Sequence, residues 1–385
     1  MLNPDWKPVV RWITAQAPPP LAVPPRRPIC LGMRDADFTA RPTTDQERHS
    51  RSLAVWLLSV ATMVAIMVVL GGLTRLTGSG LSMAQWNPHH LLPPLSAEQW
   101  DQAFAQYRQT PEFRLVNPHM DKAGYQGIFV LEYIHRLWGR LIGLAFAVPL
   151  AWFAWRRRLP AGQTLRLLGL LALGGAQSLV GWLMVASGLV DVPQVSHLRL
   201  AAHLLLALII LAALIWTALD LLHPAKTPPD PAFPGLAFPD LAFKVTAAVA
   251  ALALATMAWG ALVAGLHAGK VFNTFPLMEG AWFPTGALIE RPPLVNALVT
   301  PAAVQYVHRV LAMTTWACLS LLGLWAGLTG RARPLWLAAA WTWIQAALGI
   351  ATLVQGAPLA LAALHQGGAV ILLALLTWAL HTLRR

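Results

Sequence analysis

Two short phrases with a histidine in the same place occur far apart in the chain. Residues 132–136 read EYIHR and residues 305–309 read QYVHR. Each phrase opens a long apolar segment, and a second histidine follows in a later apolar segment, His203 after the first phrase and His365 after the second. An ionisable side chain is costly to bury in hydrocarbon, so a histidine within such a segment indicates a functional site.

Two imidazoles from two helices can fill the axial positions of a haem iron, provided that each is neutral and turns Nε2 toward the metal. We therefore predict one haem pocket made by His135 and His203 and another made by His308 and His365. A packed imidazole hydrogen-bonded between helices is the alternative, and the duplication favours haem ligation over it. Zinc and copper sites need three or four protein ligands that converge on one point, and neither half supplies such a set. A proton relay stays open but leaves the duplication unexplained.

The other eight histidines lie in the tail, in loops or near the ends of apolar segments. We interpret them as solvated or interfacial residues rather than ligands. They are His49, His89, His90, His119, His197, His223, His267 and His381.

The two phrases differ at their first residue, which is Glu132 in one and Gln305 in the other. Glu132 stands three residues before His135, so both lie on one helix face. A carboxylate near a haem edge can move protons or stabilise a cationic intermediate. Alternatively, Glu132 orients an imidazole through a hydrogen bond or pairs with Arg136 or Arg140. Because glutamine keeps the hydrogen bonding and drops the charge, we favour chemistry, and we place it in the first half.

An arginine follows the first histidine of each pair, Arg136 in one half and Arg309 in the other. A guanidinium can bind a carboxylate through two hydrogen bonds, so we expect these two side chains to pair with haem propionates. Arg75 and Arg140 have the same option or simply anchor the chain at the membrane interface.

The composition indicates a membrane protein that crosses the bilayer many times. Hydrophobic residues make up 57% of the 385 residues and charged residues 11%, whereas a soluble domain has roughly 25% charged residues. A spanning helix needs about 20 apolar residues. Eight stretches meet this requirement: 53–72, 131–154, 164–186, 197–219, 243–265, 303–327, 334–354 and 360–381.

The formal charge of +12 reflects membrane topology rather than nucleic-acid binding, because the arginines cluster at the ends of spans. These are Arg48, Arg51, Arg156, Arg157, Arg158, Arg331, Arg333, Arg384 and Arg385. All face one side if both termini are cytoplasmic, which predicts a multi-pass protein of a bacterial inner membrane. The two cysteines, Cys30 and Cys318, lie in the tail and in a span, so we expect no disulfide between outward loops.

The apolar segments around His203 and His365 resemble each other, and Trp216 and Trp378 follow these histidines at the same interval. We therefore predict an all-α fold of eight transmembrane helices arranged as two parallel four-helix repeats, related by an axis along the membrane normal. The predicted parts are a disordered Pro- and Arg-rich tail, a first half, a linker and a second half. Their bounds are 1–50, 51–222, 223–242 and 243–385. The tail also allows a translation start at Met33. In the long loop before the second span, Ser96 and Gln99 predict a capping box at the start of an amphipathic helix.

The combined motifs resemble the haem A synthases of proteobacteria and mitochondria. The matching segments are GGLTRLTGSGLSMAQW, YRQTPEF with the following NPHM, EYIHRLWGRLIG, FNTFPLMEGAWFP, VQYVHRVLA and LAALHQGGA. The resemblance covers nearly everything after residue 50. It implies oxidation of a methyl group of haem O to a formyl group, giving haem A for cytochrome oxidase.

The resemblance also implies a role for each half. His135 and His203 would ligate the substrate or product haem, His308 and His365 would ligate a resident haem B, and Glu132 would be the carboxylate required for oxidation. Another branch of the family has a cysteine pair in outward loops, which this chain lacks. The electron acceptor stays unidentified, and a haem O synthase is the expected source of substrate.

Two other functions fit a membrane protein with two haem pockets. One is a dihaem cytochrome b that carries electrons without modifying haem. The other is a protein that delivers haem to the oxidase. Glu132 and the family's loop motifs favour haem A synthesis over both.

Overall fold

The computed structural model describes residues 44–83, 92–160, 162–189, 193–223, 238–330 and 332–384. Within these ranges the regular structure is helical, and the only β-type pairing is an isolated bridge between Met278 and Ala281. Eight of the helices are long and apolar enough to cross a membrane, which confirms the predicted all-α membrane fold.

The eight long helices each contain one of the predicted spans. They are α1 (Thr44–Leu76), α4 (Lys122–Trp155), α5 (Gln163–Ala186), α6 (His197–Leu222), α7 (Phe238–Gly265), α9 (Pro301–Thr329), α10 (Arg333–Val354) and α11 (Leu359–Leu383). Shorter elements lie in the loops, namely α2 (Ala97–Tyr107), α3 (Pro111–Leu115), α8 (Asn296–Val299) and the single 3₁₀ turns η1 (Ala268–Lys270) and η2 (Pro293–Val295). Helix α1 begins within the predicted tail, and the rest of that tail, with Met33 and Cys30, lies outside the described residues. Most of the predicted linker lies outside them too.

Local sequence signals fix several helix ends. Ser96 accepts from the backbone N–H of Gln99, and the Gln99 side chain accepts from the Ser96 N–H, so the predicted capping box is present at α2. Asp121 caps α4 through the N–H of Gly124 at 2.8 Å. Helix α9 starts at Pro301, where no intrahelical donor is needed. Gly330 caps its C-terminal end in the left-handed conformation, with a φ of 64°.

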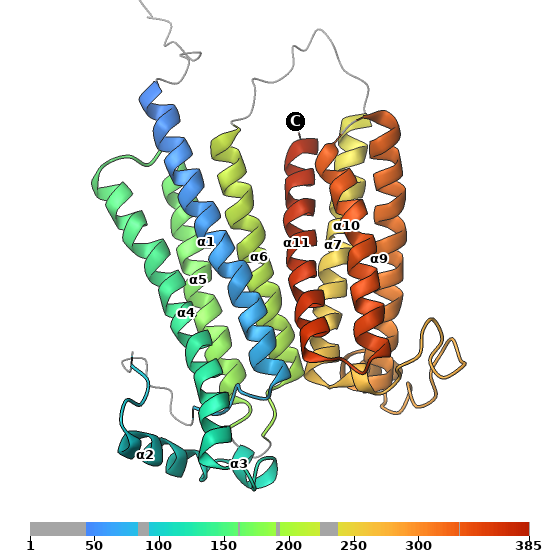
Figure 1. Cartoon of the computed structure of the whole chain (residues 1–385). Coiled ribbons are helices and arrows are strands. Elements are labelled where there is room, and N and C mark those ends of the chain that lie inside the picture. The colour runs from blue at the N-terminus through green and yellow to red at the C-terminus, as the bar shows by residue number, and fades with distance from the viewer. Residues whose placement is uncertain are drawn as a thin grey trace, which may run out of the picture. The chain divides into compact units, whose positions relative to one another are not determined.

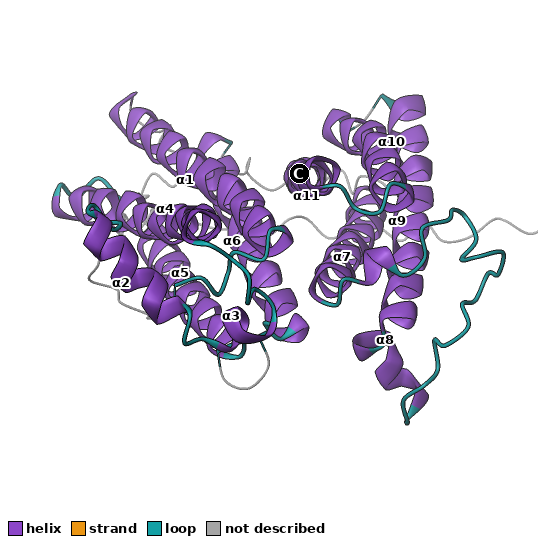
Figure 2. Cartoon of the chain, turned by 60° about the horizontal axis from the view of Figure 1, so that its bottom comes forward, coloured by secondary structure: helices purple, strands orange, loops and turns teal. Residues whose placement is uncertain are grey.

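The long helices form two groups of four (Figure 2). The first group contains α1, α4, α5 and α6, and the second contains α7, α9, α10 and α11. The groups meet through α1 and α6 on one side and α7 and α11 on the other. The segments after α1 and after α7 lie at one end of the bundle, here called the loop end (Figure 1). The start of α1 and the end of α11 lie at the opposite, termini end.

A side chain from the second group enters the first group directly after His365. The Gln366 amide donates to the carbonyl of Val68 in α1 at 2.7 Å. A Cβ atom on Gly72 would lie 1.7 Å from the Gln366 Oε1, so the glycine leaves the space that the Gln366 amide occupies. Helix α1, a member of the first group, therefore also contacts the second group near the histidines.

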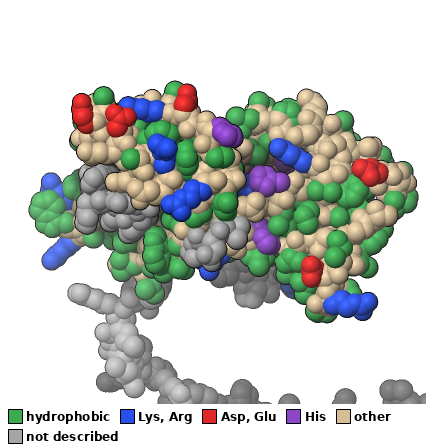
Figure 3. All heavy atoms as spheres, turned by 90° about the horizontal axis from the view of Figure 1, so that it is seen from below, with side chains coloured by type: hydrophobic (Ala, Val, Ile, Leu, Met, Phe, Trp, Pro, Cys, Tyr) green, Lys and Arg blue, Asp and Glu red, His purple; other side chains and the backbone are tan. Residues whose placement is uncertain are grey.

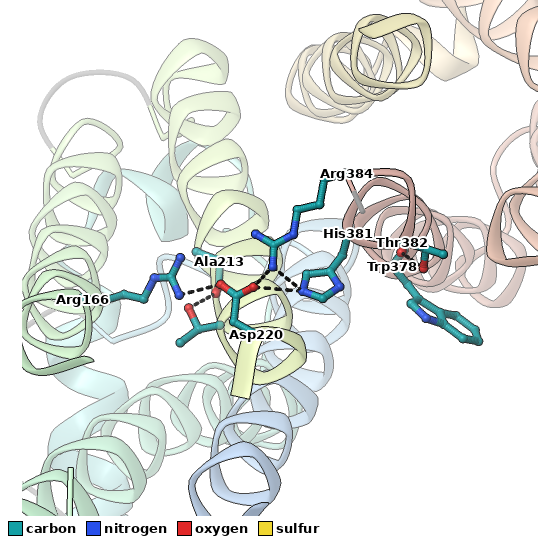
Figure 4. A network of polar contacts seen from close by, with 8 residues as sticks. Arg166, Ala213, Asp220, Trp378, His381, Thr382 and Arg384 are labelled. Atoms are coloured by element: carbon teal, nitrogen blue, oxygen red, sulfur yellow. Dashed lines mark hydrogen bonds and ion pairs between the residues drawn. The ribbon is translucent and has the colours of Figure 1, made fainter. Parts of the chain in front are cut away.

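At the termini end, Asp220 of α6 joins three cationic or titratable side chains (Figure 4). It accepts from Arg166 of α5 at 2.7 Å, from His381 of α11 at 3.0 Å and from Arg384, which follows α11. The Arg384 guanidinium lies over the Trp216 ring, 4.7 Å from its centroid. His381 is only 2% exposed, so it is not solvated, although it lies near the end of its span as predicted. Its burial is possible because Asp220 supplies a partner.

Candidate haem-binding site

The structure brings together the histidine pairs expected from the sequence. His135 of α4 lies near His203 of α6, and His308 of α9 lies near His365 of α11. All four imidazoles are half-buried within their helix groups. Each pair comes from two helices of one group, which is the arrangement that two axial ligands of one haem require. Among the described residues no three His, Cys, Asp or Glu side chains converge as a larger metal cluster would need.

Each of the four imidazoles packs against a glycine on a neighbouring helix. A Cβ atom built on these glycines would lie between 2.8 and 3.3 Å from the nearest ring atom. The contacts are Gly71 with His135, Gly181 with His203, Gly260 with His308 and Gly349 with His365. The first helix of each group supplies the glycine for the second helix, and the third helix supplies it for the fourth.

One ring nitrogen of His308 is already oriented by the backbone. Its Nδ1 lies 3.0 Å from the carbonyl oxygen of Thr256 in α7, and because a carbonyl only accepts, Nδ1 carries the proton. Nε2 is then the unprotonated nitrogen, which is the form that binds a metal. His308 thus fits the role of an axial ligand.

The histidine on the fourth helix of each group contacts a glutamine on the third. The Gln177 amide nitrogen lies 3.0 Å from the His203 carbonyl oxygen and 3.2 Å from its Nδ1. The corresponding distances from Gln345 to His365 are 2.8 and 3.1 Å. In both glutamines the amide oxygen is buried without a hydrogen-bond partner. Neither glutamine is among the site residues predicted from the sequence, although Q-x-x-x-G occurs in both helices, at Gln177 and at Gln345.

Glu132 holds the loop that follows α1. It is 2% exposed. It accepts hydrogen bonds from the Ser82 hydroxyl at 2.6 Å, the Met83 N–H at 2.9 Å and the Arg136 guanidinium at 2.5 Å. The pairing with Arg136, one of the alternatives drawn from the sequence, is therefore present. The three donors come from the loop after α1 and from the next turn of α4, so the carboxylate ties the loop to the helix.

In the second group, the side chains at the corresponding positions donate hydrogen bonds to the loop, whereas Glu132 accepts hydrogen bonds from its loop. The Gln305 amide donates to the Phe272 carbonyl at 2.9 Å. Arg309 donates to the same carbonyl at 2.9 Å and to the Thr274 carbonyl at 2.7 Å. The exchange of Glu132 for Gln305 thus matches loops that present donors in one group and acceptors in the other. The guanidinium groups of Arg136 and Arg309 are expected to pair with haem propionates, and in this structure both donate hydrogen bonds to protein groups instead.

Residues 96–120, here called the loop-end cap, cover the loop end of α4. Tyr107 of α2 stacks on Tyr125 of α4, with ring centroids 4.9 Å apart. Glu112 of α3 is 6% exposed, and its Oε2 atom has no hydrogen-bond partner. Burial raises the pKa of Glu112 to about 7, the Tyr107 hydroxyl opposes this shift and the charge of Glu132 adds to it. Sequence reasoning placed Glu112 in a family motif and gave it no role.

The second loop also contacts the first group. The Arg75 guanidinium, at the end of α1, donates to the Gly265 carbonyl at 2.9 Å and lies 3.0 Å from Nε2 of His267. Burial, followed by the charge of Arg75, lowers the pKa of His267, which leaves a neutral ring to accept this hydrogen bond. Figure 3 looks onto the loop end and shows histidine side chains at the surface with basic side chains nearby.

Comparison with known proteins identifies the family. Residues 54–377 match the family described as cytochrome oxidase assembly protein, COX15-CtaA. The chain is 46% identical over 340 residues to the haem A synthase of Rhodospirillum centenum, covering 87% of this chain and 89% of that protein. It is 44% identical over 341 residues to the haem A synthase of Paramagnetospirillum magneticum, covering 87% and 94%. It is also 44% identical over 345 residues to that of Parvibaculum lavamentivorans, covering 89% and 96%.

The chain belongs to the COX15-CtaA family of cytochrome oxidase assembly proteins. The match reaches all eight long helices, leaving out only the start of α1 and the end of α11, and it includes both histidine pairs.

Proposed function

We propose that this protein is a haem A synthase, a membrane oxidoreductase that converts haem O to haem A by oxidising a ring methyl group to a formyl group. The observation that carries the proposal is the presence of two histidine pairs, one in each helix group, in a chain similar to named haem A synthases over most of its length. The first group would bind haem O and release haem A, and the second would hold a resident haem B. The contacts shared by the groups also support two parallel four-helix repeats.

The histidine environments fit the haem groups. His308 has its Nδ1 proton fixed on a backbone carbonyl and leaves Nε2 free. Glycines beside all four rings leave each imidazole room between helices. His135 and His203 would hold the substrate, and His308 and His365 would hold haem B. Bound haem supplies the redox-active iron, while the protein positions the ring and excludes water.

Two differences between the groups support the first as the reacting one. Only the first has a buried carboxylate, Glu132, three residues before its first histidine. A carboxylate beside a reacting methyl group can accept a proton as a C–H bond breaks or stabilise positive charge that develops there. In addition, α5 touches α4 at few positions, whereas α10 packs along α9. The looser first group suits a ligand that must enter and leave.

We further propose that the protein lies in a bacterial inner membrane with both termini in the cytoplasm, because arginines gather at the termini end of the helices. Arg136 and Arg309 would bind haem propionates after giving up part of their present hydrogen bonds to the protein. A haem O synthase would deliver substrate within the membrane, and a separate redox partner would accept electrons.

The proposal is tested by adding haem O to purified protein in a competent redox system and analysing the extracted pigments. Wild type should produce haem A. Glu132→Gln, which copies the residue of the second group, should lower the rate by about 100-fold or more and keep haem B. The exposed Glu279 provides the control, and Glu279→Gln should act like wild type. Unchanged haem O with the wild-type protein would contradict the proposal and favour a dihaem cytochrome b or a haem delivery protein.

A further inference from the structure

We infer that Gln177 and Gln345 are positioning residues that orient the imidazoles of His203 and His365. When Nε2 of each histidine binds haem iron, the glutamine Oε1 accepts a hydrogen bond from the Nδ1–H group. The inference rests on the proposed function, because it concerns the same histidines. It adds a role for two glutamines on helices α5 and α10, neither of which supplies a ligand.

The geometry occurs twice, in two separate helix groups. In each, the amide nitrogen lies within 3.0 Å of the histidine's own carbonyl oxygen and within 3.2 Å of its Nδ1. The two contacts fix both the backbone and the ring of the same histidine from a neighbouring helix. The same atoms meet in both groups, and in the first group the amide nitrogen also lies 3.4 Å from Nε2 of His203.

The unpartnered amide oxygens point to a second state of these side chains. Oε1 of Gln177 and Oε1 of Gln345 are both buried without a donor. A buried acceptor left unsatisfied destabilises the fold, so these atoms need a partner. A neutral imidazole that binds iron through Nε2 carries its proton on Nδ1 and so becomes a donor. A turn of the amide then presents Oε1 to Nδ1. It gives up the amide's bond to the histidine carbonyl, which keeps the N–H donor of its own helix.

The surroundings of His365 hold the glutamine in reach. Gly368, one helical turn beyond the histidine, lies so close to Gln345 that a Cβ atom there would be 2.2 Å from Oε1. Gly349, one turn beyond Gln345, lies against the imidazole, where a Cβ atom would be 2.8 Å from the ring. The glutamine and the glycine of the Q-x-x-x-G motif therefore contact the same ring from one helix face.

The test measures haem B affinity and reduction potential in Gln345→Leu and Gln345→Glu of the full chain. Gln345→Leu removes the Nδ1 partner, so the dissociation constant for haem B should rise roughly 10- to 100-fold and the potential should shift upward. Gln345→Glu offers a stronger acceptor, makes the imidazole a better donor to iron and should shift the potential downward. Gln355 is exposed at the end of the same helix, and Gln355→Leu should change neither quantity.

Opposite shifts in the two variants would support positioning through the hydrogen bond, since a general loosening of the fold would not reverse sign. If Gln345→Leu fails to fold, the downward shift in Gln345→Glu decides the question alone. Wild-type affinity and potential in Gln345→Glu would overturn the inference while leaving the proposed function intact. A wild-type protein that binds no haem B would instead contradict the proposed function.

Discussion

The four candidate haem ligands share a local design in which a glycine on one helix faces an imidazole on another. The contact is closest at Gly181 and Gly349, where a Cβ atom would meet the ring at 2.8 Å. Real Cβ atoms do not approach so closely, so an added methyl group has to move the ring or separate the helices. The glycines therefore determine the position that each imidazole ring can occupy between the helices.

Gly181→Ala should displace His203 and impair the first haem pocket. We expect haem O binding to weaken by roughly 10-fold or more, as when a ligand's supporting contacts are removed, while haem B in the second group is retained. Titration of purified protein with haem O, followed by absorption spectroscopy, measures this effect. Gly175→Ala on the same helix is the control, because a Cβ atom there meets nothing within 4 Å. Equal binding by the two variants would show that the glycine contact does not position His203.

The sequence was sufficient to propose the histidine pairs and the role of Glu132, because residue types, apolar context and duplication can all be recognised from the sequence itself. It did not identify what these side chains touch. The Gln177 contact spans 26 residues and the Ser82 contact with Glu132 spans 50. Such partners depend on how helices and loops pack, which no local pattern specifies. The burial of His381 was missed for the same reason, since Asp220 lies 161 residues away.

Among the elements, the long helices were predictable and the loop-end cap only in part. Apolar stretches indicated all eight spans, and the capping box at Ser96 indicated α2. The extension of α4 back to Lys122 was not predicted, because residues 122–130 are less apolar than the span. Tyr125 and Phe129 in this extension pack with Tyr107 of α2, so tertiary contacts stabilise the added turns. Helix α3 has five residues and gives no periodic signal.

The raised pKa of Glu112 makes the stability of the loop-end cap depend on pH. The folded-state pKa of about 7 exceeds the ordinary value of 4.5, so the folded cap binds more protons than the unfolded chain between these values. Stability therefore falls as the pH rises from about 4.5 to about 7 and changes little outside that range. Glu112→Gln should abolish the fall, because a neutral amide has no charge to bury.

Amide hydrogen exchange of residues 97–115, corrected for the intrinsic pH dependence, measures this effect. Opening of the wild-type cap should be at least ~10-fold more frequent at pH 8 than at pH 5, since each pKa unit corresponds to a factor of ten. Glu98→Gln is the control, because Glu98 is exposed on α2 and should leave the wild-type difference in place. An unchanged difference in Glu112→Gln would show that another group is responsible.

At the level of the whole bundle, two links at different depths join the helix groups. Near the histidines, Gln366 of α11 reaches the Val68 carbonyl of α1. At the termini end, Asp220 of α6 binds His381 and Arg384 at the end of α11. The two links attach α11 to the first group on both sides of its apolar middle. Such attachment would keep the two proposed haem pockets at a constant separation, which electron transfer between them needs.

Removing the charge of Asp220 should loosen the termini end of this interface. Asp220→Asn leaves Arg166 and Arg384 without their common carboxylate and keeps the shape of the side chain. Loss of one partner from a fully buried ion pair costs about 3–5 kcal/mol. The Arg166 side chain is 40% exposed and the Asp220 side chain 15%, so solvent screening should reduce the loss to roughly 1–3 kcal/mol. Thermal unfolding of the detergent-solubilised protein measures the change.

The exposed pair of Asp101 in the loop-end cap and Lys122 at the start of α4 provides a matched control. Its side chains are 66% and 36% exposed, so Asp101→Asn should cost no more than about 1 kcal/mol. A double-mutant cycle between Asp220→Asn and Arg384→Gln then separates their direct interaction from other effects of each change. We expect a coupling of at least ~0.5 kcal/mol, because the two side chains contact each other across the groups. Additive effects of the two substitutions would mean that the Asp220–Arg384 pair does not hold α11 against α6, and that the His381 contact and apolar packing join the groups at this end.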